Sequence, residues 1–205
     1  MARRAGGLFV GAFLVTGAIQ AVTGFIPAAP SLPVAAKAPS DDFGKFTGSN
    51  APIKPGSVPN REWEKLINKW GNKCETLTPA LLAAQLHQES MGFNENVVAG
   101  TLNSPAGARG ISQFIPSTWA TEGVDANGDG KANILDPEDS IPSTALFDCK
   151  LAKGTRNVPG DSVENMLAGY NAGGNKVLKY QGVPPYKETQ DYVRIIKNKA
   201  GRFEQ

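Results

Sequence analysis

The sequence has few of the side chains on which metal centres and many hydrolytic sites depend. Its 205 residues include one histidine, His87, and two cysteines. A structural zinc site takes four His or Cys ligands, and a Ser-His-Asp triad needs a histidine as its base. One histidine and two cysteines are too few for a zinc site, and nothing indicates a triad. His87 itself is predicted to face solvent or to make a shallow contact on its helix.

An excess of charge of one sign is also missing. The net charge is +2, and Arg3 and Arg4 account for both units, so 19 basic and 19 acidic side chains remain from Lys37 onward. Nucleic-acid binding requires a dense basic surface. A neutral domain therefore gives no reason to expect a nucleic acid as partner.

Runs of alternating apolar and polar residues, the pattern of exposed strands, are missing too, and no internal repeat is visible. Apolar residues recur instead at helical spacing. The predicted fold is mainly α, a single helical domain. Helices are expected at about 63–70, from Thr78 to about Met91, from Asp161, and from about Tyr186.

The first residues have the pattern of an export signal. Arg3 and Arg4 are followed by the apolar stretch Leu8–Ile26 and then by small residues near Ala36. This order predicts a signal peptide over residues 1–36. An uncleaved membrane anchor is the alternative, since about 20 apolar residues can span a bilayer. Either way the domain is expected outside the cytoplasm, with membrane contact only through this segment.

A change of composition then divides the chain. Seven of the fifteen prolines lie between Pro27 and Pro59, among Gly, Ser and Ala. Such a stretch cannot build a packed core, so residues 37–59 are predicted to be a linker and residues 60–205 the folded domain. We expect this domain to act as a monomer.

One acidic residue lies on the apolar side of its helix. Leu82 and Leu86 define a buried stripe, and Glu89 continues it at the next turn. Burial disfavours the charged form of a carboxyl group and raises its pKa, which suits a general acid near neutral pH. A glutamate that completes a hydrogen bond in the core is the alternative.

Two further segments carry glycines, amides and aromatic rings. Residues 107–119 combine glycines with Gln113, Phe114 and Trp119, and residues 168–173 contain Tyr170 and Asn171 between small neighbours. Glycines let the backbone approach a ligand closely. With a carboxylic acid, this is the set of groups that a sugar-binding cleft requires.

In this order, the motifs resemble those of the lytic transglycosylases of the bacterial cell wall, the branch related to goose-type lysozyme. The resemblance covers about residues 78–196, and its last motif spans residues 182–189 with Tyr192 and Val193. It implies a mainly helical, α+β lysozyme-like fold with a substrate cleft, in a secreted or cell-wall-associated protein. It also implies Glu89 as the catalytic acid and base, peptidoglycan glycan strands as the substrate, and no cofactor for the chemistry. It places the substrate at Ser90, Gln113, Phe114, Tyr170, Asn171 and Tyr192.

Two positions depart from the pattern of that family. Ser112 stands where a methionine is usual before Gln113, which makes this wall more polar, and Met91 is inserted after Ser90. Neither change falls on Glu89. Both affect the expected details of the sugar subsites.

A partner carboxylate for Glu89 is not evident in the sequence. Most glycosidases use two carboxyl groups, and neither Glu95 nor Glu122 has a compelling spacing. The resemblance implies a substrate-assisted reaction at the MurNAc–GlcNAc β-1,4 bond, which leaves a 1,6-anhydromuramyl product. A hydrolytic muramidase and a non-catalytic peptidoglycan-binding module are the alternatives.

An acidic loop fits the pattern of a calcium-binding loop, apart from its last residue. Its ligands would be Asp125, Asn127, Asp129, the carbonyl of Lys131, and Asp136, where glutamate is usual. The loop predicts a structural Ca²⁺ of reduced affinity. Two consecutive turns on a solvated loop are the alternative.

The two cysteines are expected to pair. Export favours disulfide formation, so Cys74 and Cys149 are predicted to form a bridge, with two free buried thiols as the alternative.

Overall fold

The structure is a computed structural model that describes residues 46–205. The predicted signal peptide and the start of the predicted linker lie outside these residues. The described part of the chain is helical, and its β-structure is one isolated bridge between Arg109 and Phe114. The helices are α1 Arg61–Trp70, α2 Pro79–Glu89, α3 Glu95–Val98, α4 Pro116–Glu122, α5 Pro137–Thr155, α6 Ser162–Ala172, α7 Gly174–Tyr180 and α8 Lys187–Ala200.

Local signals in the sequence determine where the helices begin. The side chain of Thr78 accepts a hydrogen bond from the backbone N–H of Leu81, and Pro79 occupies the first turn of α2. Asp161 caps α6 in the same way through the backbone N–H of Val163. Both caps satisfy amide groups that the first turn leaves unpaired. All four predicted helices are confirmed.

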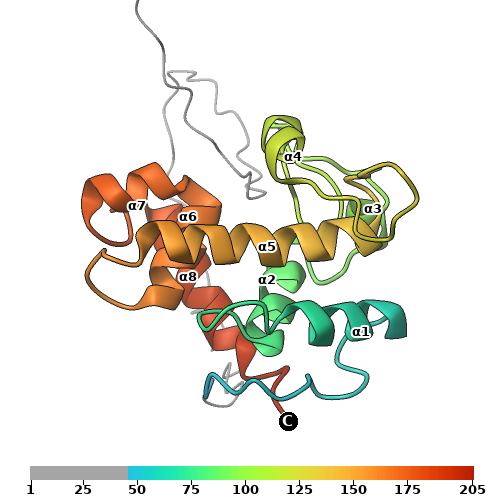
Figure 1. Cartoon of the computed structure of the whole chain (residues 1–205), viewed down its shortest axis with the longest axis horizontal. Helices are drawn as coiled ribbons and strands as arrows, with labels where there is room; N and C mark the ends of the chain where they lie inside the picture. Colours follow the sequence, from blue (N-terminus) through green and yellow to red (C-terminus); the bar gives the residue numbers. More distant parts are fainter. Residues whose placement is uncertain (1–45) are drawn as a thin grey trace, which may run out of the picture.

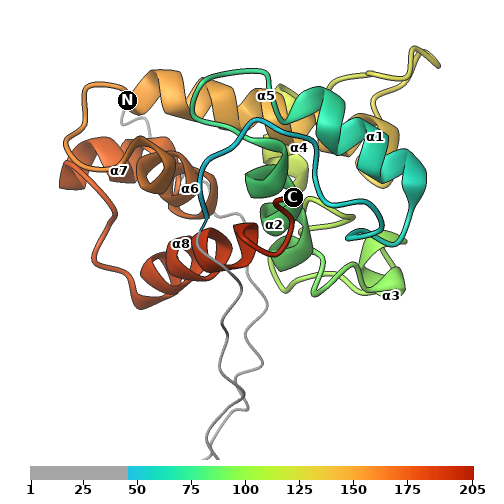
Figure 2. The same cartoon turned by 90° about the horizontal axis from the view of Figure 1, so that it is seen from below.

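The longest helix, α5, is the axis of the domain. It extends across the whole molecule, with α6, α7 and α8 at one end and α3, α4 and the acidic loop at the other (Figure 1). Helix α2 lies in the middle and packs against α1 and α8 (Figure 2). The end of α2 is therefore enclosed by other helices rather than by solvent.

The predicted disulfide is confirmed. Cys74, in the turn before α2, is bonded to Cys149 on α5, with Cα atoms 5.8 Å apart. The bridge closes a loop of 75 residues in sequence separation, and the loss of loop entropy in the unfolded chain is worth about 4 kcal/mol. It fixes the start of α2 against the long helix.

The second part of the predicted linker does not behave as one. Ile53 and Val58 are buried in the hydrophobic core, and the backbone N–H of Lys54 donates to the carbonyl of Phe203 at 2.7 Å. The side chain of Glu204 accepts hydrogen bonds from the backbone of residues 47–49. Residues 46–59 therefore belong to the folded domain: two apolar side chains in a proline-rich stretch are enough to anchor it.

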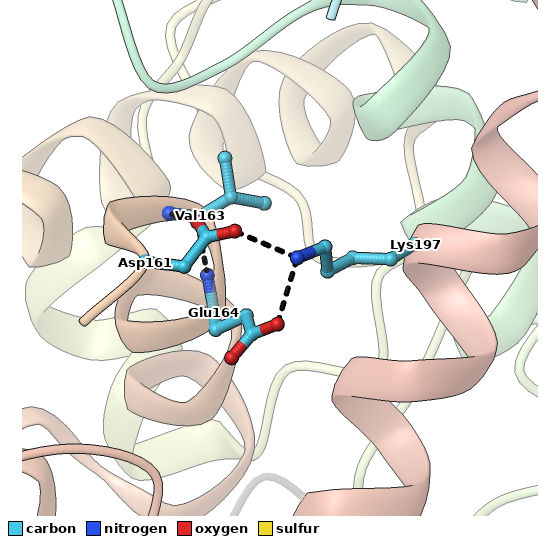
Figure 3. A network of polar contacts seen from close by, with 4 residues as sticks. All are labelled: Asp161, Val163, Glu164 and Lys197. Atoms are coloured by element: carbon cyan, nitrogen blue, oxygen red, sulfur yellow. Dashed lines mark hydrogen bonds and ion pairs between the residues drawn. The ribbon is translucent and has the colours of Figure 1, made fainter. Parts of the chain in front are cut away.

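Helices α6 and α8 are also joined by a polar cluster. The ammonium group of Lys197 on α8 lies 2.7 Å from Asp161 and 2.7 Å from Glu164, at the start of α6 (Figure 3). The two helices that carry Tyr170 and Tyr192 are thereby held in one orientation.

Candidate active site

Glu89 lies where the sequence places it, on the inward face of α2. Leu82 and Leu86 are fully buried, and Glu89 itself is 6% exposed at the last residue of the helix. The predicted burial of this carboxyl group is confirmed. A glutamate at such a position is desolvated while a small part of its surface still reaches solvent.

The carboxyl group of Glu89 has a phenol as its polar neighbour. The hydroxyl of Tyr192, on α8, donates a hydrogen bond to Oε1 of Glu89 at 2.5 Å. The pKa of Glu89 is raised to about 8, chiefly by burial; the hydrogen bond from Tyr192 lowers it, and negative charge on the nearby Asp148 or Glu188 acts to raise it. Glu89 is thus a protonated acid at neutral pH.

Ser90 shapes the end of α2 beside Glu89. Its hydroxyl donates to the carbonyl of Leu86 at 2.6 Å and accepts from the backbone N–H of Phe93 at 2.9 Å. Its side chain is fully buried and bonded to the backbone. Ser90 ends the helix and so fixes the direction of the Glu89 side chain.

The segment 107–119 forms a tight turn around Gln113. Gly110 has φ of +70°, and a Cβ at this position would meet the carbonyl oxygen of Ile134 at 2.5 Å, so only glycine fits. Gln113 has φ of +50°, and its amide donates to the carbonyl of Gly110 at 2.9 Å. The amide oxygen of Gln113 is buried and has no hydrogen-bond partner among the described residues.

Ser112 anchors this turn to two helices. Its hydroxyl donates to the carbonyl of Ser140 on α5 at 3.1 Å, and its own carbonyl accepts from the hydroxyl of Tyr170 on α6 at 2.8 Å. The polar residue that departs from the family pattern therefore makes a buried hydrogen bond. It holds the Gln113 turn in place.

Phe114 and Tyr170 lie in the core rather than at a surface. Both are fully buried, and their rings pack together with Phe147, with centroids 5.5–6.0 Å apart. Direct contact between these rings and a sugar, as the sequence predicts, does not fit this position. Aromatic side chains of a motif on an all-helical domain can face the core as readily as a cleft.

Asn171 connects two of the motifs that the sequence singled out. It is buried, and its Oδ1 accepts a hydrogen bond from the hydroxyl of Thr189 at 2.7 Å. Thr189 lies on the first turn of α8, three residues before Tyr192. The motif at residues 168–173 and the motif at residues 182–189 thus meet one turn from the acid.

A family model matches this arrangement. The transglycosylase SLT domain model matches residues 65–193, which is more than half of the chain. The chain belongs to the transglycosylase SLT family. The match begins within α1 and ends at α8, so it includes Glu89 and Tyr192.

A curated relative supports the same assignment over part of the chain. Over 68 residues the chain is 41% identical to membrane-bound lytic murein transglycosylase B of Escherichia coli (strain K12). The matched stretch is 33% of this chain and 18% of that protein, so the chain corresponds to a small part of the relative's length. No solved structure matches the chain.

The SLT domain contains a second buried acid that sequence reasoning missed. Asp148 on α5 is fully buried, and its Oδ1 accepts a hydrogen bond from the amide of Gln85 at 3.2 Å. A signal was present: Asp148 follows Ile141 and Ala145 at helical spacing, on the same apolar face. This is the argument that found Glu89, applied to the next long helix.

The acidic loop of the SLT domain is held by its own side chains. Asp125 accepts hydrogen bonds from the backbone N–H groups of Gly128, Asp129 and Gly130, and Asp136 caps α5. Within residues 46–205 no group of three or more His, Cys, Asp and Glu side chains is arranged to hold a metal ion. The predicted calcium site is therefore not supported, and the oxygens of Asp125 and Asp136 make the hydrogen bonds of the turns and the cap.

His87 is enclosed by aromatic side chains of the SLT domain. The ring of His87 packs against Phe93 and Phe203, and burial lowers its pKa to about 4, helped by the charges of Lys199 and Arg202. It is thus more enclosed than the sequence indicates.

None of the helices within residues 46–205 is long and apolar enough to cross a bilayer.

Proposed function

We propose that this chain is a peptidoglycan lytic transglycosylase in which Glu89 is the only acid and base. The observation that carries the proposal is the burial of the Glu89 carboxyl group, which raises its pKa to about 8, in a chain of the transglycosylase SLT family. The relative's name supports murein as the substrate. No cofactor takes part in this chemistry.

The first step uses Glu89 as an acid. Its proton goes to the glycosidic oxygen between N-acetylmuramic acid and N-acetylglucosamine, the C1–O bond breaks, and positive charge develops at C1. The acetamido group of the substrate stabilises this centre. Tyr192 stabilises the carboxylate that Glu89 becomes, because its hydroxyl already points at Oε1.

The second step uses the same group as a base. The carboxylate of Glu89 takes the proton from the muramyl 6-hydroxyl, whose oxygen closes onto C1 of the same sugar. The acid is regenerated, and a 1,6-anhydro product leaves without water being consumed. A single carboxyl suffices, which agrees with the exposed position of Glu95 and with the ion pair that Glu122 forms with Lys150 at 2.6 Å.

The buried motif residues support the site from behind in this proposal. Gln113 is buried and holds its own turn by donating to the carbonyl of Gly110. Tyr170 holds the same turn through the carbonyl of Ser112, and Asn171 fixes the start of α8 through Thr189. These residues position the segments around Glu89 rather than contact the sugar.

The setting follows from the first residues of the chain. We propose that residues 1–36 direct the domain out of the cytoplasm to the cell wall, as a secreted protein or tethered by that segment. It would act there as a monomer on glycan strands.

Product analysis tests the proposal. Purified sacculi are incubated with the protein, and released fragments are examined by mass spectrometry and by a reducing-end assay. We expect muramyl fragments one water lighter than hydrolysis products, with no gain of reducing ends. Reducing-end products would show a hydrolytic muramidase instead, and binding without any released fragment would show a wall-binding module.

A further inference from the structure

The buried acid Asp148 has no role in the reaction described above, yet its position is unusual. It is fully buried on α5 and lies close enough to Glu89 to affect its titration. Across residues 46–205 no ion pair involves Asp148. An ionised carboxylate without a counter-charge is costly in such a place, because neither water nor a cation compensates its lost hydration.

Asp148 and Gln85 each have one oxygen without a hydrogen-bond partner. The amide of Gln85 donates to Oδ1 of Asp148 at 3.2 Å. Oδ2 of Asp148 and Oε1 of Gln85 are both buried without a partner. Both atoms are acceptors if Asp148 is ionised, so neither can satisfy the other.

A single proton on Asp148 would provide a hydrogen bond for both unpaired oxygens. Carboxyl and amide groups are planar forks of similar size, so an N–H···O bond on one side allows the two remaining oxygens to approach each other. A proton on Oδ2 of Asp148 then donates to Oε1 of Gln85, and the pair has two hydrogen bonds with no unpaired atom. Burial, which raises the pKa of Asp148 well above its usual value, favours the same state.

We infer that Asp148 remains a neutral carboxylic acid in the folded enzyme and forms a pair with Gln85 that is joined by two hydrogen bonds. Through this pair Asp148 acts as a positioning residue for Glu89. Gln85 and Glu89 lie four residues apart on α2 and thus on one face. The pair ties this face to α5 one turn before the acid. It also keeps a second negative charge away from Glu89. The part that concerns Glu89 rests on the proposed function.

The surroundings of Asp148 define what its ionisation would do. The titratable groups that feel its charge are Glu89 on α2, Tyr170 on α6 and Tyr192 on α8, and Glu188 at the start of α8 acts on Glu89 as well. All of them are acids. Ionisation of Asp148 would raise the pKa of Glu89 and remove the only donor available to Gln85 Oε1.

The protonation state can be measured without any activity. Carboxyl carbons of aspartate are labelled in Glu89→Gln protein, which removes the coupled acid, and the Asp148 signal is assigned by its loss in the variant that also carries Asp148→Asn. We expect the chemical shift of a protonated acid up to neutral pH. An ionised signal at pH 6 would overturn the inference. Failure of the proposed function would leave this result untouched.

Activity profiles then test the effect on Glu89. Asp148→Asn preserves both hydrogen bonds to Gln85 and is neutral at every pH, so the alkaline limb of its pH–rate profile on sacculi should stay at the wild-type position. A limb displaced to lower pH would show that Asp148 is ionised in the wild type, because removing that charge lowers the pKa of Glu89.

A reversed pair separates positioning from simple packing. Gln85→Glu places two carboxyl groups together, so one must ionise as pH rises, and the alkaline limb should move to higher pH with a lower maximal rate. Adding Asp148→Asn restores an acid–amide pair with the roles exchanged and should return the limb toward wild type. A double variant as displaced as Gln85→Glu alone would contradict the pair. Circular dichroism on each variant checks the fold.

Discussion

Helix α8 contacts two carboxyl groups whose pKa values are shifted in opposite directions. At the contact with α2, Glu89 is 6% exposed, receives one hydrogen bond from Tyr192, and has its pKa raised to about 8 by burial. At the contact with α6, Asp161 is half-exposed; partial burial would raise its pKa, but Lys197 and the backbone N–H of Val163 lower it overall (Figure 3).

This difference shows how a domain separates structural acids from a reactive one. A carboxylate that joins elements is surrounded by donors, which stabilise its charge. A carboxyl that must hold a proton at neutral pH is given few donors and little water.

The largest effect should come from removing the proton of Glu89. Glu89→Gln keeps the size of the side chain but cannot deliver a proton, so release of soluble fragments from sacculi should fall by about 10³-fold or more. Co-sedimentation with sacculi should persist, because the Gln113 turn is unchanged. As a control, Asp161→Asn should retain release, and activity of Glu89→Gln within about tenfold of wild type would refute its role.

The same substitution should stabilise the fold at alkaline pH. The folded pKa of Glu89 is raised from 4.5 to about 8, so its contribution to stability is complete below about pH 4.5 and is lost as pH rises through about 8. The free energy of unfolding of Glu89→Gln should exceed that of wild type by about 2–5 kcal/mol at pH 9. Urea denaturation at pH 4 and pH 9 measures it; equal differences at both would argue against a buried neutral acid.

Tyr192→Phe should give an intermediate effect on the reaction. The hydroxyl of Tyr192 lowers the pKa of Glu89 by stabilising its charged form, so its loss should move the alkaline limb of the pH–rate profile to higher pH. The maximal rate should fall about tenfold, since the carboxylate left after proton transfer loses a hydrogen bond. Tyr180→Phe, at an exposed tyrosine, is the matched control. A limb that moves to lower pH would contradict the assignment.

The smallest effect should come from the Asp161 contact. Lys197→Met keeps the length of the side chain and removes its charge, and it should reduce the free energy of unfolding by at most about 1 kcal/mol, because solvent screens this partly exposed cluster. The pKa of Asp161 is lowered, so the difference should be present at neutral pH and vanish as pH falls through the folded pKa. Thermal melts at pH 7 and pH 2.5 test this, and a loss of enzymatic activity would be unexpected.

Much of the fold was predictable because its signals are local. Thr78 with Pro79, and Asp161 with Glu164, mark helix starts through groups within four residues. The burial of Glu89 followed from its spacing with Leu82 and Leu86. The disulfide followed from the presence of two cysteines in a chain with an export pattern.

The rest depends on contacts between distant segments, which local patterns do not report. Whether Phe114 and Tyr170 face substrate or core is decided by Phe147, more than 20 residues from either. The proline-rich composition of residues 46–59 gives no local sign that Ile53 and Val58 are buried among exposed neighbours. The loop at Asp125 matches a calcium pattern because the same Asx turns build both kinds of loop.

The attachment of residues 46–59 determines where this domain can be cut. Ile53 fills the core, Lys54 bonds to the carbonyl of Phe203, and Glu204 holds the backbone around Gly48, so the two ends of the domain close on each other (Figure 2). A recombinant fragment that starts at Asn60 would expose the ring of Phe203, which is 2% exposed in the whole domain. Expression boundaries should therefore be set before Phe46, and removal of the last two residues should loosen the opposite end of the chain.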